Sequence, residues 1–374
     1  MSTPMIEVRH LKKYFDTPKG MLHAVDDVTF KIGKGRTMGV VGESGCGKST
    51  LGRTMIHLLE STDGQILMNG EDITRVDKKK LHEINEKMQI VFQDPYSSLN
   101  PRQTVEEIIR EPLTLSRRYK SRAEIDEKTE DLMHLVGIDE RLRHAYPHEL
   151  DGGRRQRVGI ARALSLNPEF IVCDEPVSAL DVSIQAQVLN LLQDLQEKQG
   201  LTYMFVTHDL SVVRHISDDI CVMYLGQLVE TSPAKELFIR PLHPYTKALL
   251  SAIPSTDIHH PHERIHLKGE ITSPVDPKPG CRFAARCPYA CERCHQPQEL
   301  TELAPNHFVS CCRAAELNGL AYERNTAYEY AKRNRLRAQH DGGNLRLRRR
   351  PADDRRGHRI QRSRGPRRPR TGDV

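Results

Sequence analysis

The run Gly42-Glu-Ser-Gly-Cys-Gly-Lys-Ser49 constrains this chain of 374 residues more than any other feature. It matches the spacing G-x-x-x-x-G-K-[ST] and stands between a strand-like apolar stretch, residues 37–41, and a helix-like pattern over residues 48–59. Glycines in such a strand–loop–helix unit let backbone N–H groups converge on a phosphate at the helix N-terminus. The sequence therefore predicts a phosphate-binding loop, with a merely flexible Gly/Ser loop as the alternative.

Two side chains of this loop are predicted to act on a nucleoside triphosphate. Lys48 should reach the β- and γ-phosphates, and the Ser49 hydroxyl should ligate Mg²⁺. The residues predicted to contact the nucleotide here are Gly42, Glu43, Ser44, Gly45, Cys46, Gly47, Lys48, Ser49 and Thr50.

Two acids, Asp174 and Glu175, follow the apolar stretch Phe170-Ile-Val-Cys173. Ligands of open α/β sheets gather at the carboxyl ends of the strands, where these carboxylates are expected. Asp174 is predicted to hold the Mg²⁺ shell, and Glu175 to orient or deprotonate the attacking water. Acids at strand ends are often only solvated caps, so this hypothesis depends on the glycine loop in the same chain.

Strand-like and helix-like stretches follow one another in the order that a parallel α/β sheet requires. Residues 6–32 are β-prone around a turn and suggest an antiparallel lobe, whereas residues 102–168 are mainly helix-like. A buried strand over residues 203–206 follows a helix at about 182–198. We therefore expect an α/β fold with an added antiparallel lobe.

The composition argues for a water-soluble chain. It is 37% hydrophobic and 28% charged, and no run approaches the roughly 18 apolar residues that a membrane-spanning helix requires. The start, MSTPMIEVRHLKKYF, lacks an apolar signal core. We therefore expect a cytosolic protein, in which cysteines are more often buried, metal-bound or reactive than paired in disulfides.

The formal net charge of +6 is concentrated in the tail. Residues 331–374 hold sixteen Lys and Arg against four Asp, or +12, so residues 1–330 carry about −6. The globular part is therefore not expected to bind nucleic acid through its bulk charge. A basic low-complexity end is most often a solvated segment, and we assign the tail no function.

Four further motifs accompany the glycine loop and the acids between residues 42 and 208. They are Gln93 in VFQDP, Leu150-Asp-Gly-Gly-Arg154 before RQRVGIARAL, Ser178-Ala-Leu-Asp181, and His208 in VTHDL. With these six motifs in order, the chain resembles the ABC ATPases. The resemblance implies a P-loop NTPase domain with a RecA-like core, an antiparallel β lobe and a helical subdomain.

The same resemblance implies roles for single residues. Gln93 resembles the lid glutamine that contacts Mg²⁺ and senses the membrane partner, and His208 resembles the switch histidine that contacts the γ-phosphate. Tyr14 or Phe15 resembles the aromatic that stacks on adenine, and Tyr14 is the predicted contact. The expected catalytic residues are Lys48, Gln93, Glu175 and His208. The expected Mg²⁺ ligands are Ser49, Gln93 and Asp174.

The signature loop of the family, usually Leu-Ser-Gly-Gly-Gln, carries Asp151 and Arg154 here in place of serine and glutamine. The resemblance implies a head-to-tail dimer in which Asp151, Gly152 and Gly153 close over the partner's ATP, and it adds Asp181 to the nucleotide-contacting set. An ionised Asp151 only accepts hydrogen bonds and brings negative charge toward phosphate. Unless Arg154 compensates, we expect the partner's site to be weakened while this chain's own site works. The alternative is that the two glycines and the helix N-terminus suffice.

Six cysteines gather in the Pro-, His- and Cys-rich region that begins near residue 255. The region has too few apolar residues for a core of its own, so something else must hold it. Zinc favours C-x2-C pairs, of which Cys291 and Cys294 form the only one, whereas wider thiolate spacing suits an iron–sulfur cluster. The spacing alone leaves an iron–sulfur cluster, zinc and free thiols as open alternatives.

The segments GCRFAARCP and HFVSC, with His243-Pro-Tyr-Thr upstream, resemble the C-terminal extension of the di/oligopeptide and nickel importer branch. This resemblance implies a [4Fe-4S] cluster, whose four ligands are Cys281, Cys287, Cys294 and Cys311. Cys291 and Cys312 are extra, and either replace a ligand or stay idle. The expected domains are the ATPase at 1–255, the extension at 256–330 and a basic tail at 331–374.

The expected function is ATP hydrolysis that energises uptake of di- or oligopeptides, at the cytoplasmic face of the plasma membrane. The expected cofactors are ATP, Mg²⁺ and the [4Fe-4S] cluster. The expected partners are a second ABC ATPase subunit, two transmembrane permeases and, indirectly, an extracytoplasmic solute-binding protein. The alternatives are import of nickel or another solute, a regulatory subunit with little hydrolysis, and a soluble ABC ATPase. Soluble ABC ATPases commonly carry two cassettes, and this chain has a single glycine loop.

Overall fold

A computed structural model describes residues 3–116, 118–119, 121–253, 264–267, 269–270 and 272–320. These residues belong to one compact unit that extends from Met1 to Tyr322. The expected boundary near residue 255 and the basic tail lie outside the described residues. The three-part division of the chain therefore stays a prediction.

An antiparallel sheet forms near the N-terminus, as predicted. Strands β1 (Ile6–Thr17) and β2 (Gly20–Ile32) pair around a turn at residues 17–20. Strands β4 (Asp63–Met68) and β5 (Glu71–Asp72) extend the sheet in the order β2-β1-β4-β5. The fully buried Ile6, Val8 and Leu11 share one hydrophobic cluster with residues of the central sheet, which fixes this lobe on the core.

The central sheet has the order β11-β12-β10-β9-β3-β8-β7-β6. Its parallel strands are β3 (Thr37–Val41), β6 (Met88–Val91), β7 (Phe170–Asp174), β8 (Thr202–Val206) and β9 (Asp219–Tyr224). Every residue of β3, β7 and β8 is buried, which explains their continuous apolar sequences. This α/β architecture confirms the predicted fold.

The alignment of these strands determines where the motifs lie. Parallel neighbours β3, β8, β7 and β6 end at the same edge of the sheet. The glycine loop follows β3, Gln93 follows β6, Glu175 follows β7 and His208 follows β8. Four motifs that are far apart in the sequence therefore meet at one edge.

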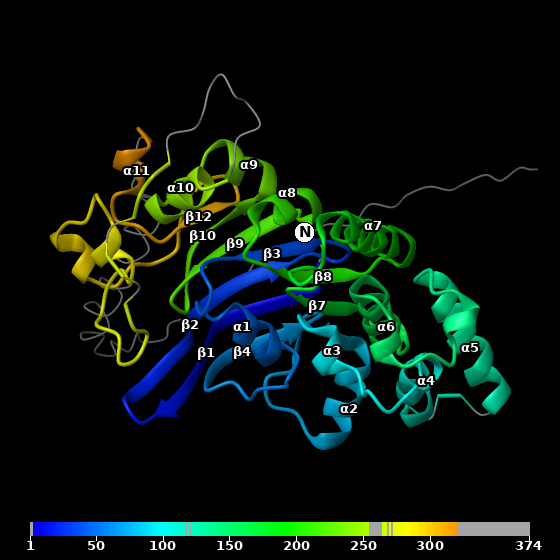
Figure 1. Ribbon diagram of the computed structural model, residues 1–374. Helices are drawn as coiled ribbons and strands as arrows, with labels where there is room; N and C mark the ends of the chain where they lie inside the picture. The colour runs from blue at the N-terminus through cyan, green and yellow to red at the C-terminus, as the bar shows by residue number, and fades with distance from the viewer. Residues whose placement is uncertain are drawn as a thin grey trace, which may run out of the picture. The chain divides into compact units, whose positions relative to one another are not determined.

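Helices cover the sheet, and α4 and α5 lie at the side of the molecule away from the C-terminal elements (Figure 1). Helix α1 (Lys48–Met55) ends four residues before the predicted end, because His57 adopts a left-handed conformation with φ 60°. The other helices are α2 (Lys78–Lys87), α3 (Pro95–Ser98), α4 (Val105–Leu115), α5 (Arg122–Leu135), α6 (Gly152–Leu164), α7 (Val182–Gln199), α8 (Leu210–Ile216), α9 (Ala234–Ile239), α10 (Pro244–Ser251) and α11 (Ala314–Leu317). Short 3₁₀ turns span Glu140–Leu142, Pro147–Glu149, Ala284–Arg286 and Glu292–His295. Within the described residues, no helix combines the length and apolar character needed to span a membrane.

The Cys-rich extension attaches to the central sheet and to the antiparallel lobe. Strand β12 (His307–Val309) pairs with β10 (Gln227–Pro233), and β11 (Thr301–Ala304) pairs with β12. Residues 274–276 run along the free edge of β2, where the His23 N–H donates to the Pro274 carbonyl at 3.0 Å. The extension is thus joined by backbone pairing to both sheets.

A buried carboxylate fixes the junction between the sheet and the extension. Glu230 on β10 is fully buried and accepts the backbone N–H groups of Leu242 at 2.7 Å and His243 at 2.9 Å. Its other contact is Nε2 of His307 on β12, at 2.6 Å. A buried carboxylate needs such partners, and here they come from two separate segments, residues 242–243 and β12.

Candidate nucleotide-binding site

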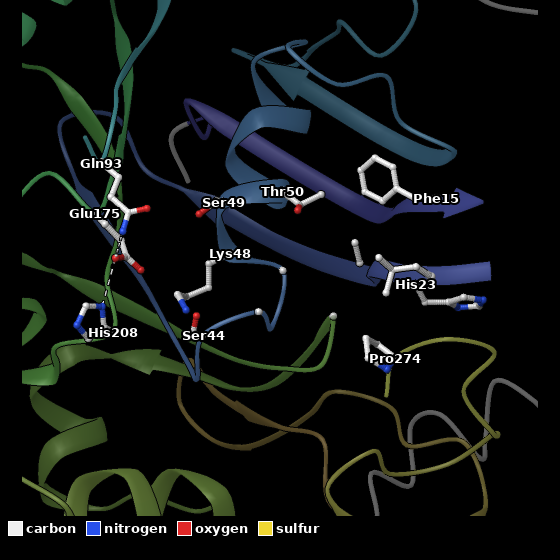
Figure 2. Close-up of a pocket in the computed structure, with 15 residues that line it drawn as sticks. Phe15, His23, Ser44, Lys48, Ser49, Thr50, Gln93, Glu175, His208 and Pro274 are labelled. Atoms are coloured by element: carbon white, nitrogen blue, oxygen red, sulfur yellow. Dashed lines mark hydrogen bonds and ion pairs between the residues drawn. The ribbon is translucent and has the colours of Figure 1, made fainter. Parts of the chain in front are cut away.

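A cavity of about 510 Å³ lies at the carboxyl edge of the central sheet (Figure 2). That volume suits a small-molecule site. Nine residues of the predicted site line it: Ser44, Gly45, Gly47, Lys48, Ser49, Thr50, Gln93, Glu175 and His208. The structure therefore brings the glycine loop and three distant motif residues around one space.

The glycine loop has a backbone that side chains would disrupt. Gly47 has φ 102°, and a Cβ atom there would lie 2.0 Å from the carbonyl oxygen of Ala24. The Lys48 ammonium is buried and donates to the carbonyls of Gly42 at 2.8 Å and Glu43 at 3.0 Å. These contacts hold the cation within the loop, beside the cavity.

Three residues of the predicted phosphate-binding loop lie outside the cavity lining. Gly42, Glu43 and Cys46 do not line the cavity among the described residues. Burial raises the pKa of the Cys46 thiol, so this cysteine is a neutral packing residue. The side chain of Glu43 instead points to the Cys-rich extension.

Oxygen ligands suited to Mg²⁺ meet behind the loop. The Ser49 hydroxyl donates to the Asp174 carboxylate at 2.6 Å, and the second carboxylate oxygen accepts from Arg53 at 3.1 Å. Asp174 is fully buried at the end of β7. A hydroxyl and a carboxylate, with the Gln93 amide nearby in the same cavity, are the hard donors that Mg²⁺ prefers.

Glu175 lies between two polar side chains at one end of the cavity (Figure 2). Its Oε2 atom accepts from Gln93 Nε2 at 2.9 Å and lies 3.3 Å from Nδ1 of His208. Its backbone has φ 49°, a conformation that is costly for a side chain with a Cβ and that clusters at functional sites. These two contacts hold the Glu175 carboxylate in one orientation, which suits a group that accepts a proton.

The lining of the opposite end of the cavity favours Phe15 over the predicted Tyr14 as the aromatic contact. Phe15 lines it, and Tyr14 does not. Successive residues of a strand point to opposite faces, so only one of the two aromatics can face the cavity. Tyr14 instead stacks on His23, with ring centroids 3.9 Å apart, and its hydroxyl donates to Asp26. Burial and that hydrogen bond raise the pKa of Tyr14, which keeps it a neutral donor.

Phe15 has one ring face available for a nucleotide base. The Lys13 ammonium lies 4.7 Å from the centroid of the Phe15 ring. Pro274, from the extension, lines the same end of the cavity (Figure 2). An aromatic face opposite a proline forms an apolar slot for a flat ring.

The extension also contacts the glycine loop directly. Arg286 donates to both carboxylate oxygens of Glu43, at 2.8 and 3.0 Å, and to the Tyr224 hydroxyl at 3.4 Å. Both contacts to Glu43 come from one guanidinium nitrogen, Nη1, and they raise the pKa of Arg286 further. The Tyr245 hydroxyl, at the start of α10, accepts the Glu43 N–H at 2.9 Å. Two segments beyond residue 240 thus hold this loop residue.

A second arginine of the extension reaches the base end of the site. Arg282 forms an ion pair with Asp26 and donates to the carbonyl of Leu225. Sequence reasoning missed Arg282, Arg286 and Pro274 as parts of this site. In the sequence these three residues are marked only by their position beside the cysteines. That position does not reveal that their partners lie more than 240 residues away.

The signature-loop residues lie outside this cavity. Asp151 is the N-cap of α6, where one carboxylate oxygen accepts the Arg154 N–H at 2.8 Å. The Arg154 guanidinium is 3.4 Å from the other oxygen, and both side chains are about half exposed. Gly152 and Gly153 begin α6, and Asp181 is the N-cap of α7. These four residues do not line the cavity within the described part of the chain.

Four cysteines face one small cavity in the extension. Cys281, Cys287, Cys294 and Cys311 line it, together with Phe283 and Tyr289. Burial raises the pKa of Cys281 to about 12 and also raises those of Cys287 and Cys311. Thiols in such a site need a bound cation to ionise. The set predicted from the resemblance is therefore brought together, and four thiols around one space fit an iron–sulfur cluster chemically.

We predict that Arg286→Ala raises the KM for ATP. Loss of this partly buried, charge-assisted pair frees Glu43 and the loop that carries it, and we expect about a 3- to 10-fold effect on KM with a smaller effect on kcat. Steady-state ATPase assays check this. The control is Arg141→Ala, which removes an exposed ion pair to Asp139. If Arg286→Ala lowers the melting temperature and leaves KM unchanged, the pair serves folding alone. The double variant Glu43→Arg with Arg286→Glu, which exchanges the two charges, should restore KM.

Comparisons with known proteins agree with the site. Residues 25–178 match the family described as ABC transporter, and residues 229–294 match the family described as oligopeptide/dipeptide transporter, C-terminal region. The oligopeptide transport ATP-binding protein AppF of Bacillus subtilis (strain 168) is 53% identical over 318 residues, which cover 82% of this chain and 96% of that protein. OppF of the same organism, an oligopeptide transport ATP-binding protein, is 51% identical over 315 residues, with 84% and 98% covered.

Solved structures are similar as well. A dimeric, post-hydrolysis state of the ATP-binding cassette MJ0796, bound to ADP and Pi, has a TM-score of 0.57 and 29% identity, and covers 62% of this chain and 99% of that one. CbiO1 from Clostridium perfringens, part of the ABC transporter complex cbiONQ, has the same TM-score and 27% identity, with 64% and 92% covered. The chain therefore belongs to the ABC transporter family, as one of its ATP-hydrolysing subunits.

Proposed function

We propose that this chain hydrolyses ATP at the cavity between the glycine loop and Glu175, and that hydrolysis energises the import of di- or oligopeptides. The observation that carries the catalytic part is the position of Glu175. Its carboxylate is held by Gln93 and His208 at one end of a cavity whose other end is apolar. Phosphates at the loop would lie between these ends, next to Lys48.

Each residue has a proposed task in this reaction. Lys48 and the loop N–H groups bind and neutralise phosphate oxygens, and Phe15 and Pro274 bind the base. Glu175 accepts the proton of the attacking water, and His208 contacts the γ-phosphate. Ser49, Asp174 and Gln93 would hold Mg²⁺, which supplies charge neutralisation at the phosphates. The pair of Ser49 and Asp174 is already joined by a hydrogen bond.

We predict that Glu175→Gln removes turnover while ATP binding is retained. The amide keeps the shape and the bond from Gln93 but is no proton acceptor, so kcat should fall by roughly 10²- to 10⁴-fold. Single-turnover hydrolysis and equilibrium nucleotide binding measure the two effects. The control is Glu236→Gln, an exposed acid on α9. Unchanged turnover in Glu175→Gln removes the proposed catalytic role.

The signature loop makes the two sites of a dimer unequal in our proposal. The exposed pair between Asp151 and Arg154 neutralises the carboxylate only weakly, because solvent screens such pairs. Asp151 would still bring negative charge toward the γ-phosphate bound by a partner subunit. We therefore propose a heterodimer in which this chain's own cavity is the active one.

We predict that Asp151→Ser raises ATP turnover of the heterodimer about twofold, because it restores the second of two sites. One unsuitable group next to the reacting phosphate can lower the rate at a site by roughly 10²- to 10³-fold. Serine is also a good N-cap, so α6 should keep its stability. Steady-state turnover of the assembled complex tests this. The matched control is Asp77→Ser, where Asp77 caps α2 in the same way. Equal or lower turnover in Asp151→Ser contradicts the proposed inequality.

We also propose that Cys281, Cys287, Cys294 and Cys311 hold a [4Fe-4S] cluster. What supports it is that four thiols from separate positions face one cavity, which Phe283 and Tyr289 also line. The cluster would cross-link the extension, which lacks a large core of its own. Visible absorption of the chain purified without oxygen tests the proposal, and loss of that absorption in Cys287→Ser is expected.

The peptide part of the proposal rests on the extension and on the relatives. Residues 229–294 match the C-terminal region of oligopeptide/dipeptide transporters, and AppF and OppF are oligopeptide transport proteins by name. We propose two transmembrane permeases and a second ATPase as partners, with an extracytoplasmic solute-binding protein acting indirectly. The chain would then lie on the cytoplasmic face of the plasma membrane.

Co-purification tests this assembly. The tagged full chain is isolated from its own cells in mild detergent without oxygen, and its partners are identified by mass spectrometry. Two polytopic permeases and a second ABC ATPase are expected, with a binding protein that prefers peptides over nickel. Recovery of soluble partners alone leaves the ATPase assignment standing and contradicts the role in transport.

A further inference from the structure

A second group of thiols lies beside the four-cysteine cavity. The sulfur of Cys294 is 3.8 Å from that of Cys291 and 3.7 Å from that of Cys312, and all three sulfurs lie within 4.8 Å of one another. Cys294 is buried, whereas Cys291 and Cys312 are partly exposed. Only Cys294 belongs also to the four-cysteine set.

Two separately anchored segments hold these sulfurs. The 3₁₀ turn Glu292–His295 brings Cys291 and Cys294 together, with the Cys294 N–H donating to the Cys291 carbonyl at 2.9 Å and the Cys291 N–H directed at the Cys294 sulfur at 3.4 Å. Cys312 follows β12, and its N–H donates to the side-chain oxygen of Gln298 at 2.9 Å. The triangle of sulfurs is therefore set by the backbone before any ion binds.

Two of the three sulfur separations match an edge of a metal–thiolate tetrahedron. With Zn–S bonds of about 2.3 Å, two sulfurs of a tetrahedral site are about 3.8 Å apart. The separations from the Cys294 sulfur to those of Cys291 and Cys312 agree with that edge. Cys291 and Cys294 also form a C-x2-C pair, the spacing typical of zinc sites. The partly exposed side leaves the fourth position to solvent or an added ligand.

The charge balance of such a site is favourable. Binding a divalent cation releases three thiol protons to solvent and leaves a net charge of −1 on the ion and its three thiolates. Arg313 is close enough to interact electrostatically with Cys291 and Cys312. Arg313 also donates to the carbonyl of Tyr289 at 3.1 Å, which keeps its cation near the cysteines.

We propose that Cys291, Cys294 and Cys312 bind a thiophilic divalent cation of the Zn²⁺ class. A thiolate that is a terminal ligand of one centre is unavailable to another, so this site competes with the four-cysteine set for Cys294. The competition rests on the iron–sulfur proposal above, whereas binding of the cation does not. The extension then holds either a cation on three thiolates or a cluster on four.

Cadmium is the probe for the binding step. The full chain, reduced and stripped with a chelator, is titrated with Cd²⁺ under argon, and the ultraviolet thiolate-to-cadmium absorption is followed. One equivalent with three thiolates is expected. Cys291→Ser and Cys312→Ser should each lower the absorption by about a third and the affinity by more than roughly tenfold, since even the loss of an outer partner of a metal ligand costs 10- to 100-fold. The matched controls, Cys281→Ser and Cys311→Ser, should stay within about twofold of the wild type.

Two results overturn the proposal. If Cys281→Ser and Cys311→Ser abolish the cadmium absorption while Cys291→Ser and Cys312→Ser retain it, the cation binds the four-cysteine set instead. If no variant changes a weak absorption, the three thiols form no site. Nucleotide binding by each variant shows that the chain is folded.

A second measurement tests the competition. Zn²⁺-loaded chain is mixed with iron and sulfide, and growth of the cluster absorption is timed. Zn²⁺ should slow cluster formation in the wild type and have little effect in the double variant Cys291→Ser with Cys312→Ser. Equal slowing in both contradicts competition. Failure to form any cluster removes the iron–sulfur proposal and the competition, and the cadmium titration then decides the three-thiolate site alone.

Discussion

The parallel pairing of β8 with β3 on one side and with β7 on the other places the ends of three buried strands in line. Val40, Val206 and Asp174 occupy matching positions in this ladder. Side chains alternate between the faces of a strand, so a shift of one residue would turn Asp174 away from α1. The hydrogen bond between Asp174 and Ser49, which joins residues 125 positions apart, exists only in this register.

The extension depends on the same core for its own position. It buries few apolar residues, and polar contacts fix it: Glu230 to His307 on the sheet, and Arg282 and Arg286 to the nucleotide-binding end. Such contacts are specific, because a buried charge without its partner is costly. The extension therefore has one position on the ATPase core. The loop that carries Glu43 is held by the strand before it and by Arg286 of the extension.

Sequence reasoning predicted the parts that local pattern determines. The glycine loop, the strand before Asp174 and the turn between β1 and β2 have local signals, and the common strand edge brings Gln93, Glu175 and His208 together without further information. The cavity lining favours Phe15 over the predicted Tyr14. Sequence could not make this choice, because adjacent strand residues carry equal aromatic signals and Asp26, which binds Tyr14, lies on another strand.

What remained hidden from sequence is long-range pairing. Strands β11 and β12 are four and three residues long, too short for alternation to reveal them. The pairing of Arg286 with Glu43 spans 243 positions and leaves no local pattern. The roles of the signature loop and of the six clustered cysteines stay predictions, since they concern a partner subunit and bound ions.

The attachment of Pro274 and Arg286 to the nucleotide end has a consequence for how the protein is made. A chain emerging from the ribosome folds from its N-terminus. After about 255 residues it already contains the glycine loop, both acids and His208, yet one wall of the cavity and the cation facing Glu43 are still to be synthesised. The walls of the nucleotide cavity in the nascent subunit are therefore complete only when the extension has docked.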